Sequence, residues 1–217
     1  MLAAHYNHPD IVELLLPYEQ GLTDSKGHNA QWHAKNSTRG GDFTRVNELL
    51  ENEGTERIPP PPKGLLLFLK SAMMGDVDGV RKHLDHAGYR SSNGTTALMM
   101  AVSNGHINCA HLLLSEAGKQ TTKDWNGLPP GTTALMIAAH RNYPEVVGFI
   151  YPYEQGKRDA NGKTALMKAA EEGHVSCALL LRGETGMQDK DGWTALMWAV
   201  WNGHTNCVRL LLSEVGV

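Results

Sequence analysis

Three cysteines are the residues of this chain best suited to nucleophilic, redox or zinc chemistry. Cys109, Cys177 and Cys207 each lie four residues after a glycine of a recurring pattern, so they occupy one repeated position and do not form a cluster. An odd number of cysteines without a CxxC spacing argues against both a disulfide framework and a zinc site. We therefore expect three reduced, buried side chains that act as small hydrophobic residues on helices.

The eleven histidines are the next candidates for metal binding. His106, His174 and His204 follow the same glycines and lie one repeat apart, so they are not expected to converge on one ion. The HExxH pattern of zinc proteases is absent from the sequence. We predict no metal site and no cofactor.

A phosphate-binding loop is suggested by Gly156 followed by Gly162-Lys163-Thr164. Five residues separate the two glycines, whereas the P-loop requires four. The same Gly-x-Thr recurs elsewhere as part of a turn, and neither a GxSxG motif nor the HRD motif of kinases occurs. We therefore predict that this chain is not an enzyme.

Composition limits the kind of partner. The 217 residues are 41% hydrophobic and 20% charged, with a net charge of −3, so no basic field for nucleic acid or an anionic membrane is expected. The apolar run Leu65 to Leu69 is too short to cross a bilayer, and residues 1–5 do not resemble a signal peptide. We expect a soluble protein that is cytoplasmic or otherwise intracellular.

The elements that position these residues follow an internal repeat. The tetrapeptide Thr-Ala-Leu-Met recurs, and in three copies Gly-His begins nine residues after its threonine, whereas the remaining copy has Asn142-Tyr143 there. The four copies occupy residues 96–99, 133–136, 164–167 and 194–197. A period of about thirty residues predicts stacked units that bury their apolar faces against each other.

Seven units account for residues 1–217. They are a partial repeat (1–21), a degenerate repeat (22–54), a repeat with a proline-rich insertion (55–88), a repeat (89–118), a repeat with a loop insertion (119–156) and two further repeats (157–186 and 187–217). Residues 1–7 match 136–142, so the chain opens within a unit. Either the chain is cut there, or the array lacks a proper cap at this end.

Each unit is predicted to form a turn, a short helix, a tight turn and a longer helix. Thr194 can cap the first helix, and Gly203 suits a turn that needs a positive φ. Val208, Leu211 and Leu212 form the apolar stripe of the second helix. The pattern predicts an all-α solenoid of helix pairs.

The run Pro59 to Pro62 favours extended polyproline II structure. It could be a ligand for a proline-binding domain or a stiff loop between units. Arg57 and Lys63 lie one place off the spacing that such ligands use, which favours the stiff loop.

The segments Asp189 to His204 and Asp159 to His174 resemble the ankyrin repeat signature, D-x-x-G-x-T-P-L-H-x-A-A-x-x-G-H. Alanine replaces the family proline and methionine replaces the family histidine, as in Ala195 and Met197. The resemblance extends over the whole chain and implies an ankyrin-repeat solenoid of helix-turn-helix units, in which the histidine after the glycine is structural. The short units are similar to ankyrin arrays of some protist parasites, which occur alone or beside NIMA-related kinase domains.

The resemblance also implies non-catalytic protein–protein interaction through the turn tips and the concave face of the first helices. The candidate partner-binding residues are Trp193, Trp198, Trp201, Asn202, Trp125, Lys168, Glu171 and Arg141. The tryptophans of the last unit can be anchors for a partner or can pack within the array, and both interpretations stay open. The favoured function is a scaffold or adaptor for an unidentified protein. The alternative is a regulatory or targeting segment of a signalling enzyme, such as a NIMA-related kinase, whose catalytic domain lies outside this chain.

Overall fold

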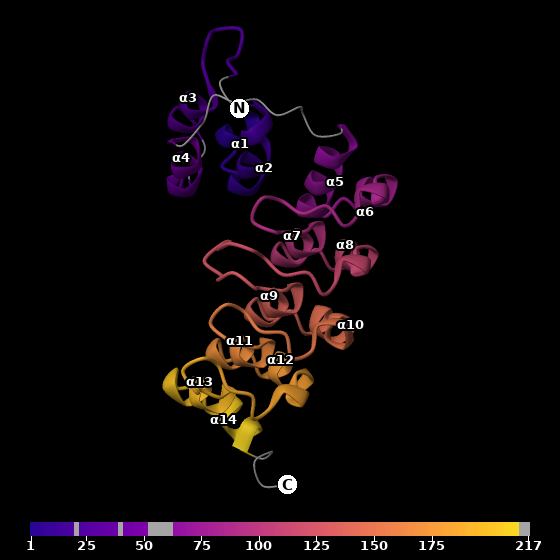
Figure 1. Ribbon diagram of the computed structural model, residues 1–217, viewed down its shortest axis with the longest axis vertical. Helices are drawn as coiled ribbons and strands as arrows, with labels where there is room; N and C mark the ends of the chain where they lie inside the picture. Colours follow the sequence, from indigo (N-terminus) through magenta and orange to yellow (C-terminus); the bar gives the residue numbers. More distant parts are fainter. Residues whose placement is uncertain (20–21, 39–40, 52–62, 213–217) are drawn as a thin grey trace. The chain divides into compact units, whose positions relative to one another are not determined.

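The structure is a computed structural model that describes residues 1–19, 22–38, 41–51 and 63–212. The chain divides into two compact units, unit 1 (Met1–Leu66) and unit 2 (Leu67–Val217) (Figure 1). The described elements are α-helices and short 3₁₀ helices, with one isolated β-bridge. The proline run 59–62, predicted as a stiff loop, lies outside the described residues.

Unit 1 is built from four short helices, α1 (Leu2–His5), α2 (Pro9–Glu19), α3 (Ala30–Lys35) and α4 (Thr44–Glu51). Helix α1 contacts α3, and α2 contacts α4, so the partial and degenerate repeats form two adjacent helix pairs. Their common core consists of Ala4, Val12, Ala34, Val46 and Leu50. Helix α5 (Lys63–Met74) runs across the boundary between the units.

Unit 2 contains the regular repeats, and its helices form two rows. The first helices contact one another in order: α7 (Ala97–Ser103), α9 (Ala134–His140), α11 (Ala165–Glu171) and α13 (Ala195–Trp201). The second helices do the same: α6 (Val77–Lys82), α8 (Ile107–Leu112), α10 (Pro144–Glu154), α12 (Val175–Leu180) and α14 (Thr205–Leu212). The 3₁₀ helices η1 (Leu84–His86), η2 (Leu114–Glu116) and η3 (Arg182–Glu184) follow α6, α8 and α12. Figure 1 shows the rows side by side, which confirms the predicted all-α solenoid of stacked helix pairs.

The repeated tetrapeptide explains why each first helix begins where it does. Thr133 Oγ1 accepts a hydrogen bond from the Met136 N–H at 3.3 Å, and Thr194 caps α13 in the same way. Thr164 makes no such bond, and its buried hydroxyl has no partner. The following Leu135 and Met136 are each 1% exposed, so both side chains belong to the core.

The tight turn between the helices of a pair requires a left-handed backbone. Gly105 and Gly203 adopt φ values of 75° and 73° there. In the repeat that lacks the glycine, Asn142 takes this position with φ 60°. Asparagine tolerates the left-handed region better than other non-glycine residues, which accounts for this departure from the repeat pattern.

The loop insertion of the fifth repeat ends in a tight hairpin. The N–H and carbonyl groups of Trp125 and Leu128 are paired at 2.9 Å in both directions, around Asn126 and Gly127. Both central residues have positive φ, as a type I′ turn requires. Trp125 is 4% exposed and Leu128 is 8% exposed, so the hairpin folds its apolar side chains inward.

The histidine of each Gly-His pair joins neighbouring repeats. Nε2 of His106, His174 and His204 donates to the carbonyl of Met73, His140 and Glu171, at 2.9, 3.1 and 2.9 Å. Each of these carbonyls lies near the end of the preceding first helix. The structural role implied for this histidine is confirmed.

Among the described helices, none combines the length and the apolar character that crossing a bilayer would need.

Candidate functional site

Four turn loops precede the first helices of unit 2, and we define them as residues 87–95, 117–132, 155–163 and 185–193. Neighbouring loops are joined through their backbones. The Ala160 N–H donates to the Pro130 carbonyl at 2.7 Å, and the Lys190 N–H donates to the Asn161 carbonyl at 3.1 Å. Arg158 also binds the carbonyl of Gln188 in the next loop. The loops therefore form a connected row and not a set of independent tips.

An aspartate folds each of the last two turn loops. Oδ1 of Asp189 accepts the N–H groups of Asp191 and Trp193 at 3.0 and 2.9 Å. Oδ1 of Asp159 accepts equivalent bonds, including one from the Lys163 N–H at 2.9 Å. Such bonds to the backbone two and four residues ahead hold the loop in one conformation.

The second oxygen of each aspartate contacts the side chain nine residues ahead, which belongs to the first helix that follows the loop. Asp189 Oδ2 accepts the indole N–H of Trp198 at 2.9 Å. Asp159 Oδ2 lies 3.0 Å from Nζ of Lys168. Lys168, predicted to contact a partner, is consequently 5% exposed, and its ammonium group is paired with a buried carboxylate.

The hydrogen bonds to these aspartates also affect their ionisation. Burial raises the pKa of Asp189, but the bonds from the Trp193 N–H, the Trp198 indole and the Asp191 N–H outweigh burial and lower the pKa below its ordinary value. In unit 1, Asp24 is bonded in the same way, first by the His28 N–H, and its pKa falls to about 2. Both carboxyl groups are thus held as carboxylates.

The three tryptophans of the last repeat form one cluster. The ring centroid of Trp193 lies 4.9 Å from that of Trp198 and 5.5 Å from that of Trp201. Nζ of Lys163 lies 3.4 Å from the centroid of Trp198 and 2.9 Å from both carboxylate oxygens of Glu171. Trp198 is therefore held by contacts with Asp189, Lys163 and Trp193.

Trp201 differs from the other two because it faces solvent. Its side chain is 73% exposed, whereas Trp193 and Trp198 are half-buried. Met197 and Val200 on the same helix are 49% and 58% exposed. An exposed group of apolar side chains of this kind is typical of interaction surfaces.

The other predicted residues have mixed surroundings. Arg141 and Asn202 are exposed and terminate α9 and α13, where Asn202 Nδ2 donates to the Trp198 carbonyl at 3.0 Å. Glu171 is half-buried and paired with Lys163. Trp125, predicted to contact a partner, is 4% exposed, because the hairpin of the insertion folds it inward.

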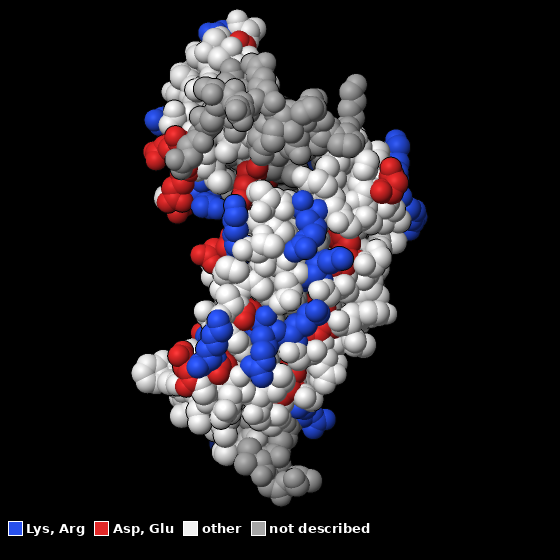
Figure 2. All heavy atoms as spheres, viewed as in Figure 1, with Lys and Arg blue, Asp and Glu red and all other residues white. Residues whose placement is uncertain are grey.

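Positive charge gathers on the turn loops, and the net charge of the whole chain conceals it. Figure 2 shows Lys and Arg side chains gathered on one face of unit 2, where the loops run. Six loop cations are exposed or half-buried: Arg90, Lys119, Lys123, Lys157, Arg158 and Lys190. None of them forms an ion pair with a carboxylate in the described part of the chain, and Arg90 and Arg158 bind neutral carbonyl groups. The exposed carboxylates of these loops are Asp124 and Asp191.

This imbalance arises because several carboxylates are used inside the array. Glu184 accepts the N–H of Gly156 at 2.9 Å and that of Leu166 at 2.8 Å, which joins the end of one repeat to the first helix of the next. Glu116 and Glu154 make the same two bonds in their repeats. Burial raises the pKa of Glu116 and Glu154, and the N–H donors oppose that rise. The sequence carries a signal for this role, because each glutamate lies two residues before the glycine that ends its repeat.

The cysteines agree with the prediction. Cys109, Cys177 and Cys207 are unpaired and 0% exposed. Burial raises the pKa of all three thiols, that of Cys177 to about 11. Thiols of this kind are poor nucleophiles at neutral pH.

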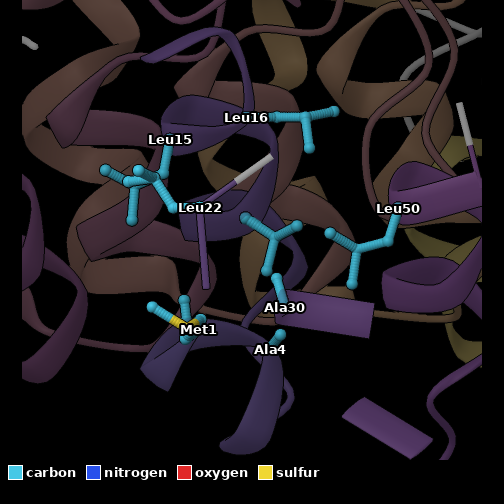
Figure 3. Close-up of a pocket in the computed structure, with 9 residues that line it drawn as sticks. Met1, Ala4, Leu15, Leu16, Leu22, Ala30 and Leu50 are labelled. Carbon is cyan, nitrogen blue, oxygen red and sulfur yellow. The ribbon is translucent and has the colours of Figure 1, made fainter. Parts of the chain in front are cut away.

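Two hollows among the described residues are candidates for ligand sites. In unit 1, a cavity of about 20 Å³ is lined by apolar side chains that include Met1, Leu15 and Leu50 (Figure 3). That volume holds about one water molecule, so it is not a ligand pocket. In unit 2, an open polar hollow of about 340 Å³ lies beside Gly75, His106 and Glu145, and His106 is already committed to the Met73 carbonyl.

Comparison with known families agrees with the repeat geometry. The sequence matches the family described as ankyrin repeats (3 copies), over residues 1–155 and over residues 135–217. The two matches together extend over the whole chain, and they coincide with the stacked helix pairs and the connected turn loops described above. Ankyrin repeats are in general protein–protein interaction modules, and this chain belongs to the ankyrin repeat family.

Proposed function

We propose that this chain is a non-catalytic scaffold or adaptor that binds a protein partner through the turn loops and the exposed ends of the first helices of unit 2. The observation that carries the proposal is the exposed Trp201 beside a row of loops that an internal network holds rigid. Aspartates, buried glutamates and inter-loop hydrogen bonds fix that row. A surface ordered before binding loses less conformational entropy when it binds.

The exposed side chains suggest how a partner would be held. Trp201, with Met197 and Val200 beside it, offers apolar area that a partner can bury, and tryptophan is frequent at binding hot spots. The six loop cations favour a partner whose facing surface is acidic, because complementary charge speeds association and disfavours neutral or basic competitors. Apolar burial would therefore supply most of the affinity, and the loops would supply selectivity.

The test is affinity capture from the source cell with three baits: the wild-type chain, Trp201→Ala and Tyr153→Ala. Tyr153 is a matched control, because it is an aromatic residue 57% exposed on α10 in the row of second helices. Circular dichroism verifies that all three baits are folded. The proposal expects a partner that wild type and Tyr153→Ala retain and that Trp201→Ala loses.

Equal recovery of every partner by the Trp201→Ala bait would overturn the proposed site. The alternative function, a segment that regulates or targets a signalling enzyme such as a NIMA-related kinase, uses the same surface. Capture of a kinase polypeptide that depends on Trp201 would favour that alternative over a general adaptor.

A further inference from the structure

Three potential metal ligands lie together at the end of the third predicted repeat, immediately before the turn loop 87–95. They are His83, Asp85 and His86, in the sequence His-Leu-Asp-His. His83 terminates α6, and Asp85 and His86 belong to η1. A 3₁₀ helix has three residues per turn, so side chains at positions i and i+3 lie on the same side. The local backbone therefore brings the two imidazoles into alignment.

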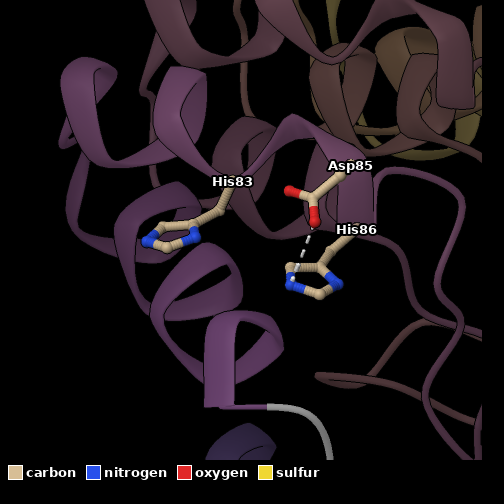
Figure 4. Close-up of side chains that lie close together, drawn as sticks. All are labelled: His83, Asp85 and His86. Atoms are coloured by element: carbon tan, nitrogen blue, oxygen red, sulfur yellow. Dashed lines mark ion pairs between the residues drawn. The ribbon is translucent and has the colours of Figure 1, made fainter.

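The geometry of the three side chains suits a single ion. One ligand atom from each residue lies within 4.8 Å of the other two. The imidazole rings are inclined by 24°, with centroids 6.3 Å apart, and Asp85 Oδ2 lies 3.6 Å from His86 Nε2 (Figure 4). A zinc–nitrogen bond of about 2.0–2.1 Å allows two ring centroids on one ion to be roughly 5–6 Å apart. The observed arrangement is therefore within a small side-chain rotation of a coordination site.

The surroundings hold the ligands yet leave access for an ion. Phe68 lies beside His86, with ring centroids 6.4 Å apart, and provides an apolar wall. The side chain of Asp85 is 73% exposed and that of His86 is 21% exposed. An ion can thus approach from solvent on the side where the Asp85 carboxylate is exposed.

We propose that His83, Asp85 and His86 form a Zn²⁺ site with an open coordination position. Two imidazole nitrogens and one carboxylate oxygen are typical zinc ligands, and three protein ligands leave a fourth position for water or for a side chain of another molecule. Calcium and magnesium prefer oxygen ligands, so they are expected to bind far more weakly. Bound zinc would clamp the end of α6 to η1 and stabilise this part of unit 2, because an ion that binds only the folded state raises its stability.

The test titrates ZnCl₂ alone into the full chain, kept reduced, with a competing chromophoric zinc indicator. The proteins compared are wild type, His83→Ala, Asp85→Asn and the control His111→Ala. His111 is an exposed histidine on α8 whose ring stacks on that of Phe149, with centroids 3.8 Å apart. Among the described residues, His111 belongs to no group of three potential metal ligands. The proposal expects one saturable site in wild type, a dissociation constant at least tenfold higher in His83→Ala, a smaller increase in Asp85→Asn, and no change in His111→Ala.

A second measurement guards against a variant that misfolds. In wild-type chain, one equivalent of zinc should shift or broaden the imidazole C–H proton resonances of His83 and His86 and leave that of His111 unchanged. Absence of saturable zinc binding would overturn the proposal. So would wild-type affinity in His83→Ala, or a zinc response confined to other histidines or to the cysteines.

Discussion

Replacing Glu184 with glutamine tests the internal network that holds the repeats together. The carboxylate is 1% exposed, and its two oxygens accept the N–H groups of Gly156 and Leu166 at 2.9 and 2.8 Å. Glutamine keeps the shape of the side chain and one acceptor oxygen, but its NH₂ group must face the other N–H. One hydrogen bond to a charged group is lost, which costs about 1.5–3 kcal/mol.

That loss can be converted into a melting temperature. For a domain of this size, 1 kcal/mol corresponds to a shift of roughly 2–4 °C, so Glu184→Gln should melt roughly 3–12 °C below wild type. Thermal and urea unfolding followed by circular dichroism measure the change. Hydrogen exchange should also show less protection at the amides of Gly156 and Leu166 than in wild type.

The matched control is Glu145→Gln, an exposed glutamate in the first turn of α10. Its cost should be within about 0.5 kcal/mol, mainly the weakened interaction with the helix dipole. If Glu184→Gln were no less stable than Glu145→Gln, the buried glutamates would not join the repeats as described. The reasoning would also fail if the Gly156 and Leu166 amides kept their protection.

Three further predictions follow from the same contacts. Because its pKa is lowered on folding, ionised Asp189 stabilises the folded state at pH values above its unfolded pKa, and this stabilisation is lost as the pH falls through its folded pKa. In urea unfolding, the difference in stability between wild type and Asp189→Asn should therefore shrink below about pH 4. A difference that stays constant with pH would contradict this prediction. Thr133→Ala should cost about 1 kcal/mol through loss of its cap bond, whereas Thr164→Ala, which removes a hydroxyl without a partner, should cost less; equal costs in thermal unfolding would argue against capping. The three buried thiols should react with a chromogenic disulfide only after denaturation, and rapid reaction of native Cys177 at pH 8 would refute its raised pKa of about 11.

The helix pairs were predictable because the information that specifies them is local and repeated. The Thr-Ala-Leu-Met tetrapeptide marks the start of a first helix, and a glycine marks the turn that ends it. Even the exception at Asn142 follows from backbone sterics. The burial of the cysteines followed from their one repeated position in the pattern.

The exposure of individual side chains was harder to predict, because it depends on contacts distant in the sequence. Lys168 occupies a position that the resemblance places on the contact surface, but Asp159 draws it inward. Trp125 lies in an insertion for which the repeat pattern provides no template, and the hairpin buries it. By contrast, Trp201 is exposed, and its role as an anchor for a partner stays a prediction.

Charge on the turn loops was missed because composition was considered for the chain as a whole. A net charge of −3 includes five carboxylates of unit 2 that are buried and internally bonded or paired. They are Glu116, Glu154, Glu184, Asp159 and Asp189. Counting charge by position within the repeat would have separated these internal acids from the exposed cations of the loops.

Hydrogen–deuterium exchange of the chain with and without a captured partner would locate the proposed interaction surface. Added protection is expected in the turn loops 155–163 and 185–193 and at the end of α13 around Trp201. No added protection is expected in the second helices α8 and α12. Protection centred on those second helices, with the turn loops and α13 unchanged, would contradict the proposed interaction surface.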